Sequence, residues 1–115
     1  MEALAEAAPS STFRALGDPV RVAIVEHLAA VDDATVNELA ALFPISLQAV
    51  SKHIQVLEAA GIVARRRDGR TRPVRLEPAT IAQTARWFEA RRRQLESRYQ
   101  RLDEVLADMK EGTRP

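Results

Sequence analysis

The chain has 115 residues, which is typical of one domain and enough to bury a single hydrophobic core. It contains no cysteine, which excludes disulfide frameworks, thiolate metal sites, cysteine nucleophiles and thiol-based redox sensing. No uninterrupted apolar run approaches the roughly 18 residues of a membrane span, and the N-terminus lacks the basic start and apolar centre of a signal peptide. We therefore expect a soluble protein of the cytoplasm.

Charge is unevenly distributed along the chain. The net charge is +1, but residues 1–60 hold three Lys/Arg against eight Asp/Glu, whereas residues 61–115 hold fourteen against eight. The two parts therefore carry −5 and +6, which indicates that the second part contacts a polyanion. Six arginines, opposed only by Asp68, fall in one window of eleven residues: Arg65, Arg66, Arg67, Arg70, Arg72 and Arg75.

Two helices are predicted in the first third of the chain. Residues 1–12 are alanine-rich, and we expect an irregular start there. A first helix then carries Phe13 and Leu16 on one side and ends at Gly17, a natural helix terminator. A second helix is predicted from Pro19 to Ala30, because proline fits the first turn of a helix. Its apolar face consists of Ile24, Val25 and Leu28.

A short third helix is predicted after residue 35. Thr35-Val36-Asn37-Glu38 matches the capping-box pattern, with Thr35 as the cap and Glu38 at the third helical position. The expected core residues that follow are Leu39, Leu42 and Phe43. Pro44 closes this helix and Ser46 caps the next one, so about three residues separate the two helices. This is the spacing of a helix-turn-helix motif.

The helix that Ser46 opens combines a buried face with a polar face. Val50, Ile54 and Leu57 recur at helical spacing, and Gly61 is a natural residue to follow the helix end. The outward residues are Gln48, Ser51, Lys52 and Gln55. Amides and hydroxyls of this kind meet base edges or phosphate oxygens in a DNA groove, and lysine neutralises phosphate. The alternative is a merely solvated outer face.

A small hairpin rich in arginine is predicted next. Val63–Arg67 and Arg70–Leu76 read as two strands joined by an Asp68-Gly69 turn, which tolerates positive φ. Pro73 cannot donate to a ladder, so the second strand should be an edge. The arginines fit phosphate contacts. They are also suited to protecting an exposed edge, but a single charge would suffice for that purpose.

One long helix is predicted from Ala79 to Lys110, where the chain has no glycine or proline. Spacings of four and three residues define a heptad seam with one polar interruption, consisting of Ile81, Ala85, Phe88, Arg92, Leu95, Tyr99, Leu102, Leu106 and Met109. The seam spans 29 residues, or about 43 Å at roughly 1.5 Å per residue. Because the preceding helices are too short to cover it, we expect part of it to pair with a second copy. The alternative is a helix packed only within its own chain.

These elements together resemble the ArsR family of bacterial winged-helix transcriptional regulators. The run from Phe13 to Arg21 is similar to the family's opening signature. The run from Leu47 to Val63, with Ser-Lys-His at 51–53, is similar to its recognition helix and first wing strand. The resemblance covers roughly residues 11–76. It implies a mainly α fold with a small β-hairpin, that is, a winged helix-turn-helix with a long C-terminal dimerisation helix.

The resemblance also implies how the protein binds DNA. Two recognition helices of a dimer, built from the first and last helices, would enter successive major grooves while the wings reach flanking DNA. The expected organisation is a single DNA-binding domain over residues 1–115, with a winged-helix core at 11–76, the wing at 63–76 and a dimerisation helix at 79–110. The predicted DNA contacts are Thr35, Ser46, Gln48, Ala49, Ser51, Lys52, His53, Gln55, Arg65, Arg66, Arg67, Arg70 and Arg72. The predicted dimer contacts are Phe13, Leu16, Ile81, Ala85, Phe88, Arg92, Leu95, Tyr99, Leu102 and Leu106.

The chain departs from the metal-sensing members of that family. Those members carry two cysteines in the third helix, where this chain has Ala40 and Leu42. Others use histidines on the last helix, which has none here, and its carboxylates at 103, 104 and 108 are expected to face solvent. The chain's two histidines, His27 and His53, lie on different predicted helices. We therefore predict no metal site and no cofactor.

Three further assignments stay open at this level. His53 borders the apolar stripe, so it either orients the helix or contacts a phosphate. Arg21 is predicted to anchor a helix junction rather than to bind DNA. Trp87, Phe88 and Tyr99 either pack in the seam or line a cavity for an organic effector, and packing is the more common role of such aromatics.

The predicted function is sequence-specific DNA binding by a homodimeric transcriptional regulator. The favoured role is a bacterial, nucleoid-associated repressor that binds an inverted-repeat operator. Catalysis is not expected, because the chain has no pairing of nucleophile and base, no phosphate loop and no metal-ligand spacing. One alternative is a protein-interaction module that pairs through the last helix. Another is a nonspecific architectural DNA-binding protein.

Overall fold

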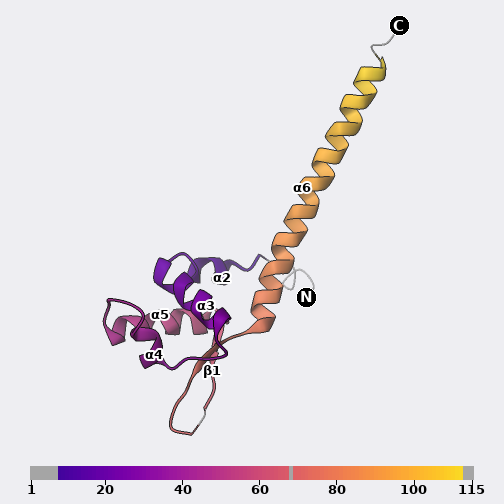
Figure 1. Cartoon of the computed structure of the whole chain (residues 1–115). Helices are drawn as coiled ribbons and strands as arrows, with labels where there is room; N and C mark the ends of the chain where they lie inside the picture. The colour runs from indigo at the N-terminus through magenta and orange to yellow at the C-terminus, as the bar shows by residue number, and fades with distance from the viewer. Residues whose placement is uncertain (1–7, 68, 113–115) are drawn as a thin grey trace. The chain divides into compact units, whose positions relative to one another are not determined.

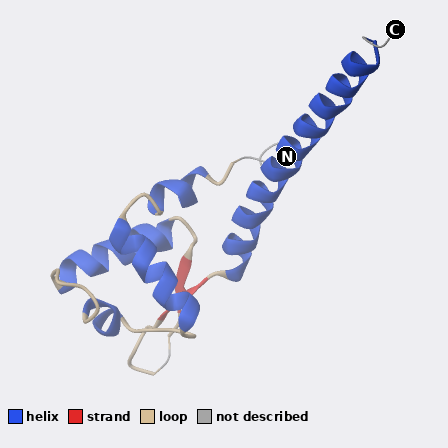
Figure 2. Ribbon diagram, turned by 45° about the horizontal axis from the view of Figure 1, so that its top comes forward, coloured by secondary structure: helices blue, strands red, loops and turns tan. Residues whose placement is uncertain are grey.

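The computed structural model describes residues 8–67 and 69–112 (Figure 1). In chain order its elements are α2 (Ser10–Ala15), α3 (Pro19–Ala30), α4 (Val36–Ala40), α5 (Leu47–Ala59), β1 (Val63–Arg65), β2 (Val74–Leu76) and α6 (Pro78–Gly112). The chain divides into two compact units, here called the N-terminal unit (up to Thr84) and the C-terminal unit (from Ala85 onward). The predicted fold class, mainly helical with one small hairpin, is confirmed (Figure 2).

Side-chain caps fix where α4 and α5 begin, as predicted. The Thr35 hydroxyl accepts from the Glu38 backbone N–H at 3.1 Å, and the Glu38 carboxylate accepts from the Thr35 backbone N–H at 2.9 Å. The Ser46 hydroxyl accepts from the Ala49 backbone N–H at 3.1 Å. These bonds satisfy N–H groups that a helix leaves unpaired at its start. The turn between α4 and α5 is therefore bounded by a capped helix on either side.

The core lies between α3, α4, α5 and the hairpin. The predicted stripe of Val50, Ile54 and Leu57 is completely buried. It belongs to one apolar cluster that also contains Ala15, Ile24, Leu28, Ala34, Leu39, Ile62, Val63 and Val74. Burial of a side chain of this size contributes roughly 1.5–3 kcal/mol. This cluster holds α5 by its apolar stripe and leaves its opposite face free.

The prediction that Leu42 belongs to the core is wrong. Leu42 is 49% exposed. Helix α4 ends at Ala40, two residues earlier than the helical pattern through Leu42 required, and Leu42 lies in the turn that follows. Phe43, the next residue, packs against the core instead.

The hairpin is shorter than predicted. β1 and β2 pair antiparallel over three residues each, with Val63 opposite Leu76 and Arg65 opposite Val74. One more backbone bond, from Arg66 N–H to the Pro73 carbonyl at 3.1 Å, extends the pairing beyond the strands. Gly69 has the expected positive φ of 62°, and Asp68, its predicted partner in the turn, lies outside the described residues.

The second strand is not a free edge at its start. The Val74 N–H donates to the Ala34 carbonyl at 2.7 Å, and the Ala34 N–H donates back at 3.0 Å. Pro73 stands just before β2 rather than inside it. The segment before α4 therefore covers the outer side of the hairpin where the predicted edge would have been open.

The long C-terminal helix is confirmed as one uninterrupted element, α6 (Figure 1). Pro78 is its first residue, where a missing N–H costs nothing. The Thr80 hydroxyl donates to the Gly61 carbonyl at 2.6 Å, and the Glu77 N–H donates to the Ile62 carbonyl at 2.8 Å. These bonds tie the start of α6 to the end of α5 within the N-terminal unit. No helix in the described part of the chain is long and apolar enough to cross a membrane.

The seam of α6 is exposed along its length. Leu95 and Leu102 are 45% and 54% exposed, and Phe88 and Tyr99 are 57% and 62% exposed. A soluble helix normally buries such a stripe. Packing against the described residues leaves this stripe exposed.

Candidate nucleic-acid interface

The outer face of α5 carries three exposed polar side chains at helical spacing. Gln48, Lys52 and Gln55 are all exposed and follow one another at four and three residues. Ala49 and Ser51, the other predicted contacts on this helix, are half-buried. Two amides and one ammonium therefore line one stripe, on the side opposite the buried Val50. This arrangement offers hydrogen-bonding groups for base edges and a cation for phosphate.

Thr35 and Ser46 stand at the two capped helix starts. Each hydroxyl oxygen accepts a backbone N–H, from Glu38 and from Ala49 respectively. The hydrogen bonds to Glu38 from the Thr35 backbone N–H and hydroxyl hold the pKa of Glu38 below its usual range. The capping box therefore stays intact at neutral pH, and these bonds hold both hydroxyls in fixed positions at the starts of α4 and α5.

His53 lies in a polar cluster between α5 and the start of α3. Its Nδ1 is 3.1 Å from Arg21 Nη1 and 4.0 Å from a carboxylate oxygen of Asp18. Arginine only donates, so Nδ1 accepts and the proton of the neutral ring lies on Nε2. Arg21 also donates through Nε to the Ala15 carbonyl. The predicted anchoring role of Arg21 thus has a definite geometry, linking α2, α3 and α5.

Asp18 completes this cluster as the cap of α3. Its carboxylate accepts from the backbone N–H groups of Val20 at 2.8 Å and Arg21 at 3.3 Å. Desolvation alone would raise the pKa of Asp18, but these two bonds and the positive charge of Arg21 outweigh it and lower the pKa. The contact between Asp18 and His53 was not predicted, because no local pattern relates residues so far apart in the sequence.

The six arginines near the hairpin fall into two groups. The Arg65 side chain is 17% exposed, and its Nε lies 3.5 Å from a carboxylate oxygen of Glu58 at the end of α5, an ion pair without a hydrogen bond. Arg75 is half-buried. The remaining four are exposed: Arg66, Arg67, Arg70 and Arg72. The hairpin therefore presents a cationic loop, whereas Arg65 is occupied by a neighbouring acid.

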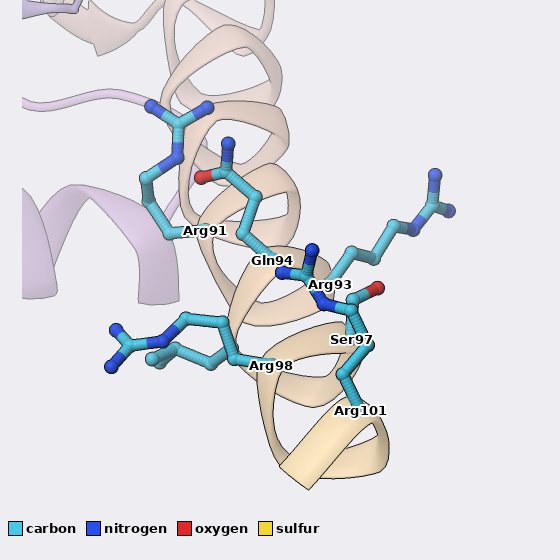
Figure 3. Close-up of a pocket in the computed structure, with 7 residues that line it drawn as sticks. Arg91, Arg93, Gln94, Ser97, Arg98 and Arg101 are labelled. Atoms are coloured by element: carbon cyan, nitrogen blue, oxygen red, sulfur yellow. The ribbon is translucent and has the colours of Figure 1, made fainter. Parts of the chain in front are cut away.

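The described residues contain no group of three or more His, Cys, Asp or Glu side chains placed to hold a metal ion. On α6, an open hollow of about 650 Å³ is lined by Arg91, Arg93, Gln94, Leu95, Ser97, Arg98 and Arg101 (Figure 3). All of these residues belong to one helix, so the hollow is a surface groove rather than an enclosed cavity. Neither Trp87 nor Phe88 lines it.

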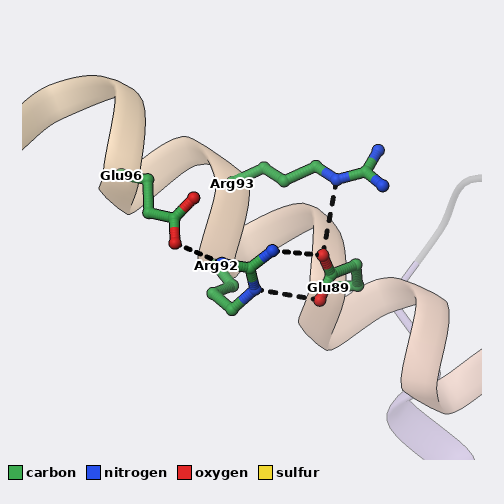
Figure 4. A network of polar contacts seen from close by, with 4 residues as sticks. All are labelled: Glu89, Arg92, Arg93 and Glu96. Carbon is green, nitrogen blue, oxygen red and sulfur yellow. Dashed lines mark hydrogen bonds and ion pairs between the residues drawn. The ribbon is translucent and has the colours of Figure 1, made fainter. Parts of the chain in front are cut away.

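Aromatic and ionic contacts run along α6. The rings of Trp87 and Phe88 meet edge to face with centroids 5.2 Å apart, and the Arg91 guanidinium lies 4.8 Å from the Trp87 ring centroid. Arg92, the polar seam residue, is held by Glu89 and Glu96 on either side (Figure 4). Its hydrogen bonds and charge hold the pKa of Glu89 below its usual range.

The geometry of the N-terminal unit defines a class of protein. Two capped helices separated by a tight turn, the second with a polar outer stripe, are followed by a hairpin with an exposed basic loop. This is the arrangement of a winged helix-turn-helix DNA-binding protein, in which α5 is the recognition helix and the hairpin is the wing.

Comparison with known proteins gives the family. Residues 16–66 match the family described as "Helix-turn-helix domain". The chain is 42% identical over 74 residues to the HTH-type transcriptional regulator Rv2034 of Mycobacterium tuberculosis. This alignment covers 64% of this chain and 68% of the relative. An ArsR-like transcriptional regulator from Rhodococcus sp. RHA1 superposes with a TM-score of 0.76 at 30% identity, over 91% of this chain and 96% of that one. The structure of the ArsR family transcriptional regulator RHA00566 superposes with a TM-score of 0.69 at 33% identity, over 76% of this chain and 90% of that one.

The chain belongs to the ArsR family of winged helix-turn-helix transcriptional regulators. It is a DNA-binding transcription regulator rather than an enzyme. The family resemblance drawn from the sequence is thereby confirmed, and the absence of cysteine distinguishes this chain from members that sense metals through thiolates.

Proposed function

We propose that this regulator binds an inverted-repeat operator as a homodimer in the bacterial cytoplasm and represses transcription there. The observation that carries the proposal is the exposed stripe of Gln48, Lys52 and Gln55 on a helix whose other face is fully buried. Gln48 and Gln55 would read base edges, and Lys52 would neutralise a phosphate. The hydroxyls of Thr35 and Ser46 would position the helix on the backbone.

The wing adds affinity that does not depend on sequence. Its four exposed arginines would reach the phosphates that flank the groove occupied by α5. His53 would contribute through Nε2, the ring nitrogen that Arg21 leaves free to donate. Arg65, half-buried and near Glu58, would contribute least among the predicted wing contacts.

Dimerisation is supported by the exposed seam of α6. Large apolar side chains recur along it, and burying each one against a second copy is worth roughly 1.5–3 kcal/mol. The other predicted dimer contacts are Phe13 of α2 and Leu16, which directly follows that helix, and both are half-buried. Two copies double the length of DNA that is read, which a single recognition helix requires for useful specificity.

Footprinting on the chain's own upstream region tests the proposal, together with competition by a scrambled duplex and a promoter-reporter assay. We expect a protected inverted repeat, little competition from the scrambled duplex, and a lower reporter signal when the protein is present. Equal competition by scrambled duplex would instead support an architectural DNA-binding protein. A protein that shows no salt-dependent retention on DNA would support an interaction module working through α6.

If the regulator responds to an effector, we expect an organic molecule rather than a metal. Among the described residues no cluster of metal ligands is present, and His27 and His53 lie on different helices. Micromolar zinc, cadmium or arsenite should therefore leave the Kd for operator DNA unchanged in a fluorescence-anisotropy titration. A metal-dependent release from DNA would reveal a carboxylate or histidine site and refute this expectation.

A further inference from the structure

Leu47, the first residue of α5, is an exposed apolar side chain that the predicted DNA contacts do not include. Its exposed fraction is 49%, whereas Ile54 on the same helix is completely buried. Ile54 follows Leu47 by seven residues, about two helical turns, so both lie on the same side of α5. This side of the helix therefore changes from buried to exposed toward its start, and Leu47 lies beyond the end of the core.

The side chain of Leu47 covers the tip of α5. In an α-helix each Cα–Cβ bond tilts toward the N-terminus, so the first residue has no preceding turn to pack on and projects past the helix start. The Ser46 hydroxyl, which accepts from the Ala49 N–H at 3.1 Å, holds this first turn in helical form. A surface that approaches the start of α5 therefore meets Leu47 together with Gln48, the first residue of the exposed polar stripe.

The first turn of α5 carries no charge that would repel DNA. It contains no acidic residue, although the helix dipole favours acids at this position and α4 has Glu38 there. In helix-turn-helix proteins, the N-terminal residues of the recognition helix contact base edges in the major groove. A single exposed leucine is common on protein surfaces, but this one lies at the end of the recognition helix that reaches the bases.

The major groove offers one group that suits a leucine. Beside hydrogen-bond donors and acceptors, the base pairs display the 5-methyl group of thymine there. A leucine placed against a donor or acceptor would leave that polar group without a partner, which costs free energy. Contact between a leucine and the methyl group instead removes apolar surface of both from water. An apolar side chain at this position therefore favours thymine over the other bases.

We propose that Leu47 selects a thymine in each operator half-site through contact with the 5-methyl group of that base. This contact presupposes the operator binding proposed above and adds a chemical criterion to it. The amide of Gln48 suits adenine, to which it can both donate and accept. The first two residues of α5 together therefore favour half-sites that contain A·T pairs.

Replacement of thymine by deoxyuridine tests the contact, because it removes only the 5-methyl group and keeps the base pairing. The probe is the duplex that the wild-type chain enriches from a random pool, with thymines replaced one symmetric pair of positions at a time. Burial of one methyl-sized group corresponds to about fourfold in Kd. At one pair of positions we therefore expect the wild-type Kd to rise about fifteenfold, which is about fourfold for each half-site.

Leu47→Ala assigns this effect to the leucine. Alanine is a good helix former and the Ser46 cap is kept, so the variant should fold, which circular dichroism establishes. On the thymine duplex its Kd should exceed that of the wild type by about the same factor. Deoxyuridine at the sensitive positions should then change its Kd by less than about twofold, because the two changes remove the same contact.

Val56→Ala is the matched control for this comparison. Val56 is also a large apolar residue exposed on α5, at 40%, but it follows Leu47 by nine residues and lies near the other end of the helix. Its truncation should leave the loss of affinity on deoxyuridine replacement as large as in the wild type.

Two results would overturn the role of Leu47. One is an enriched duplex in which deoxyuridine weakens wild-type binding at no position. The other is a sensitive position at which Leu47→Ala loses as much affinity as the wild type, because another residue then reads the methyl group. Failure of the proposed function looks different: a chain that enriches no duplex from the pool has no sequence-specific binding, and the selection of thymine fails with it.

Discussion

At the scale of single residues, the outer face of α5 offers both kinds of DNA contact on one stripe. Gln48→Ala should weaken operator binding by about 1–3 kcal/mol and leave random DNA almost unaffected, because removing the amide removes hydrogen bonds to one base. Lys52 lies one turn further along the helix. Lys52→Ala should weaken binding to operator and to random DNA by similar factors, because phosphate is the same in every sequence. Paired anisotropy titrations with operator and random duplex make the comparison. Equal weakening on both duplexes for Gln48→Ala would mean that Gln48 only positions the protein.

The cap of α3 predicts a pH dependence of stability. The pKa of Asp18 is lowered from its ordinary value of 3.8, so its stabilising effect is complete above that value and disappears as the pH falls through the lowered pKa of the folded state. Asp18→Asn keeps a cap acceptor but removes the charge. The wild type should therefore exceed the variant in Tm by a constant amount from pH 7 to pH 5, and the difference should vanish in stronger acid. A difference that persists in acid would mean that the charge of Asp18 is not its source.

Local residue patterns were readable from the sequence, whereas contacts between distant residues were not. The capping box and the Ser46 cap were predicted because each involves atoms only three residues apart. The ring of His53 left two roles open, since its contact with Arg21 joins residues 32 positions apart. The nearness of Arg65 to Glu58 was missed for a related reason, because it depends on how β1 leaves the end of α5.

At the scale of elements, the wing is predicted to supply affinity that is independent of sequence. Arg66→Ala with Arg70→Ala should weaken binding to operator and random DNA alike. It should also reduce the slope of log K against log salt by about one unit for each phosphate that the wing no longer neutralises. Both side chains are exposed. Binding measured across a series of salt concentrations gives the slope.

Two controls isolate the wing in that experiment. Arg86→Ala with Arg101→Ala removes the same charge from α6 and should leave the slope as in the wild type. Arg65→Ala should reduce the slope of log K against log salt less than the double variant of Arg66 and Arg70 does, because Glu58 already lies beside Arg65. A wing double variant with the wild-type slope would exclude the wing from the DNA interface.

Element types followed from the sequence more reliably than element ends. The 3.6-residue and two-residue periods distinguish helices from strands, but a pairing ladder ends where the backbone of two distant segments diverges. The wing strands therefore stop at Arg65 and start at Val74, although the predicted strands ran to Arg67 and from Arg70. Leu42 was misassigned for a similar reason, since α4 ends before the helical period does.

At the scale of the whole molecule, the sequence revealed a seam longer than its own chain can bury. The heptad spacing predicted α6 as one long helix, and the apolar stripe that this spacing defines is exposed in the structure. The partner of the seam and its direction depend on a second molecule, and no single-chain pattern of apolar residues specifies them.

The final prediction joins the seam to DNA recognition. Leu95 and Leu102 are large exposed apolar residues in the middle of α6, and each is worth roughly 1.5–3 kcal/mol when buried. Leu95→Glu with Leu102→Glu should therefore dissociate the dimer in analytical ultracentrifugation. The matched control is Gln94→Glu with Gln100→Glu, which adds the same charge on the outer face and should remain dimeric.

The same double variant should lose the operator. Recognition helices of a dimer lie about 34 Å apart, one turn of DNA, so the wild type should protect an imperfect inverted repeat with half-sites about 10 base pairs apart, centre to centre. A folded monomer contacts only one half-site, and its protection of the full repeat should disappear at concentrations that saturate the wild type. Circular dichroism establishes that the variant is folded before footprinting. A variant that stays dimeric, or a monomer that protects the whole repeat with wild-type affinity, would show that α6 does not organise DNA binding through dimerisation.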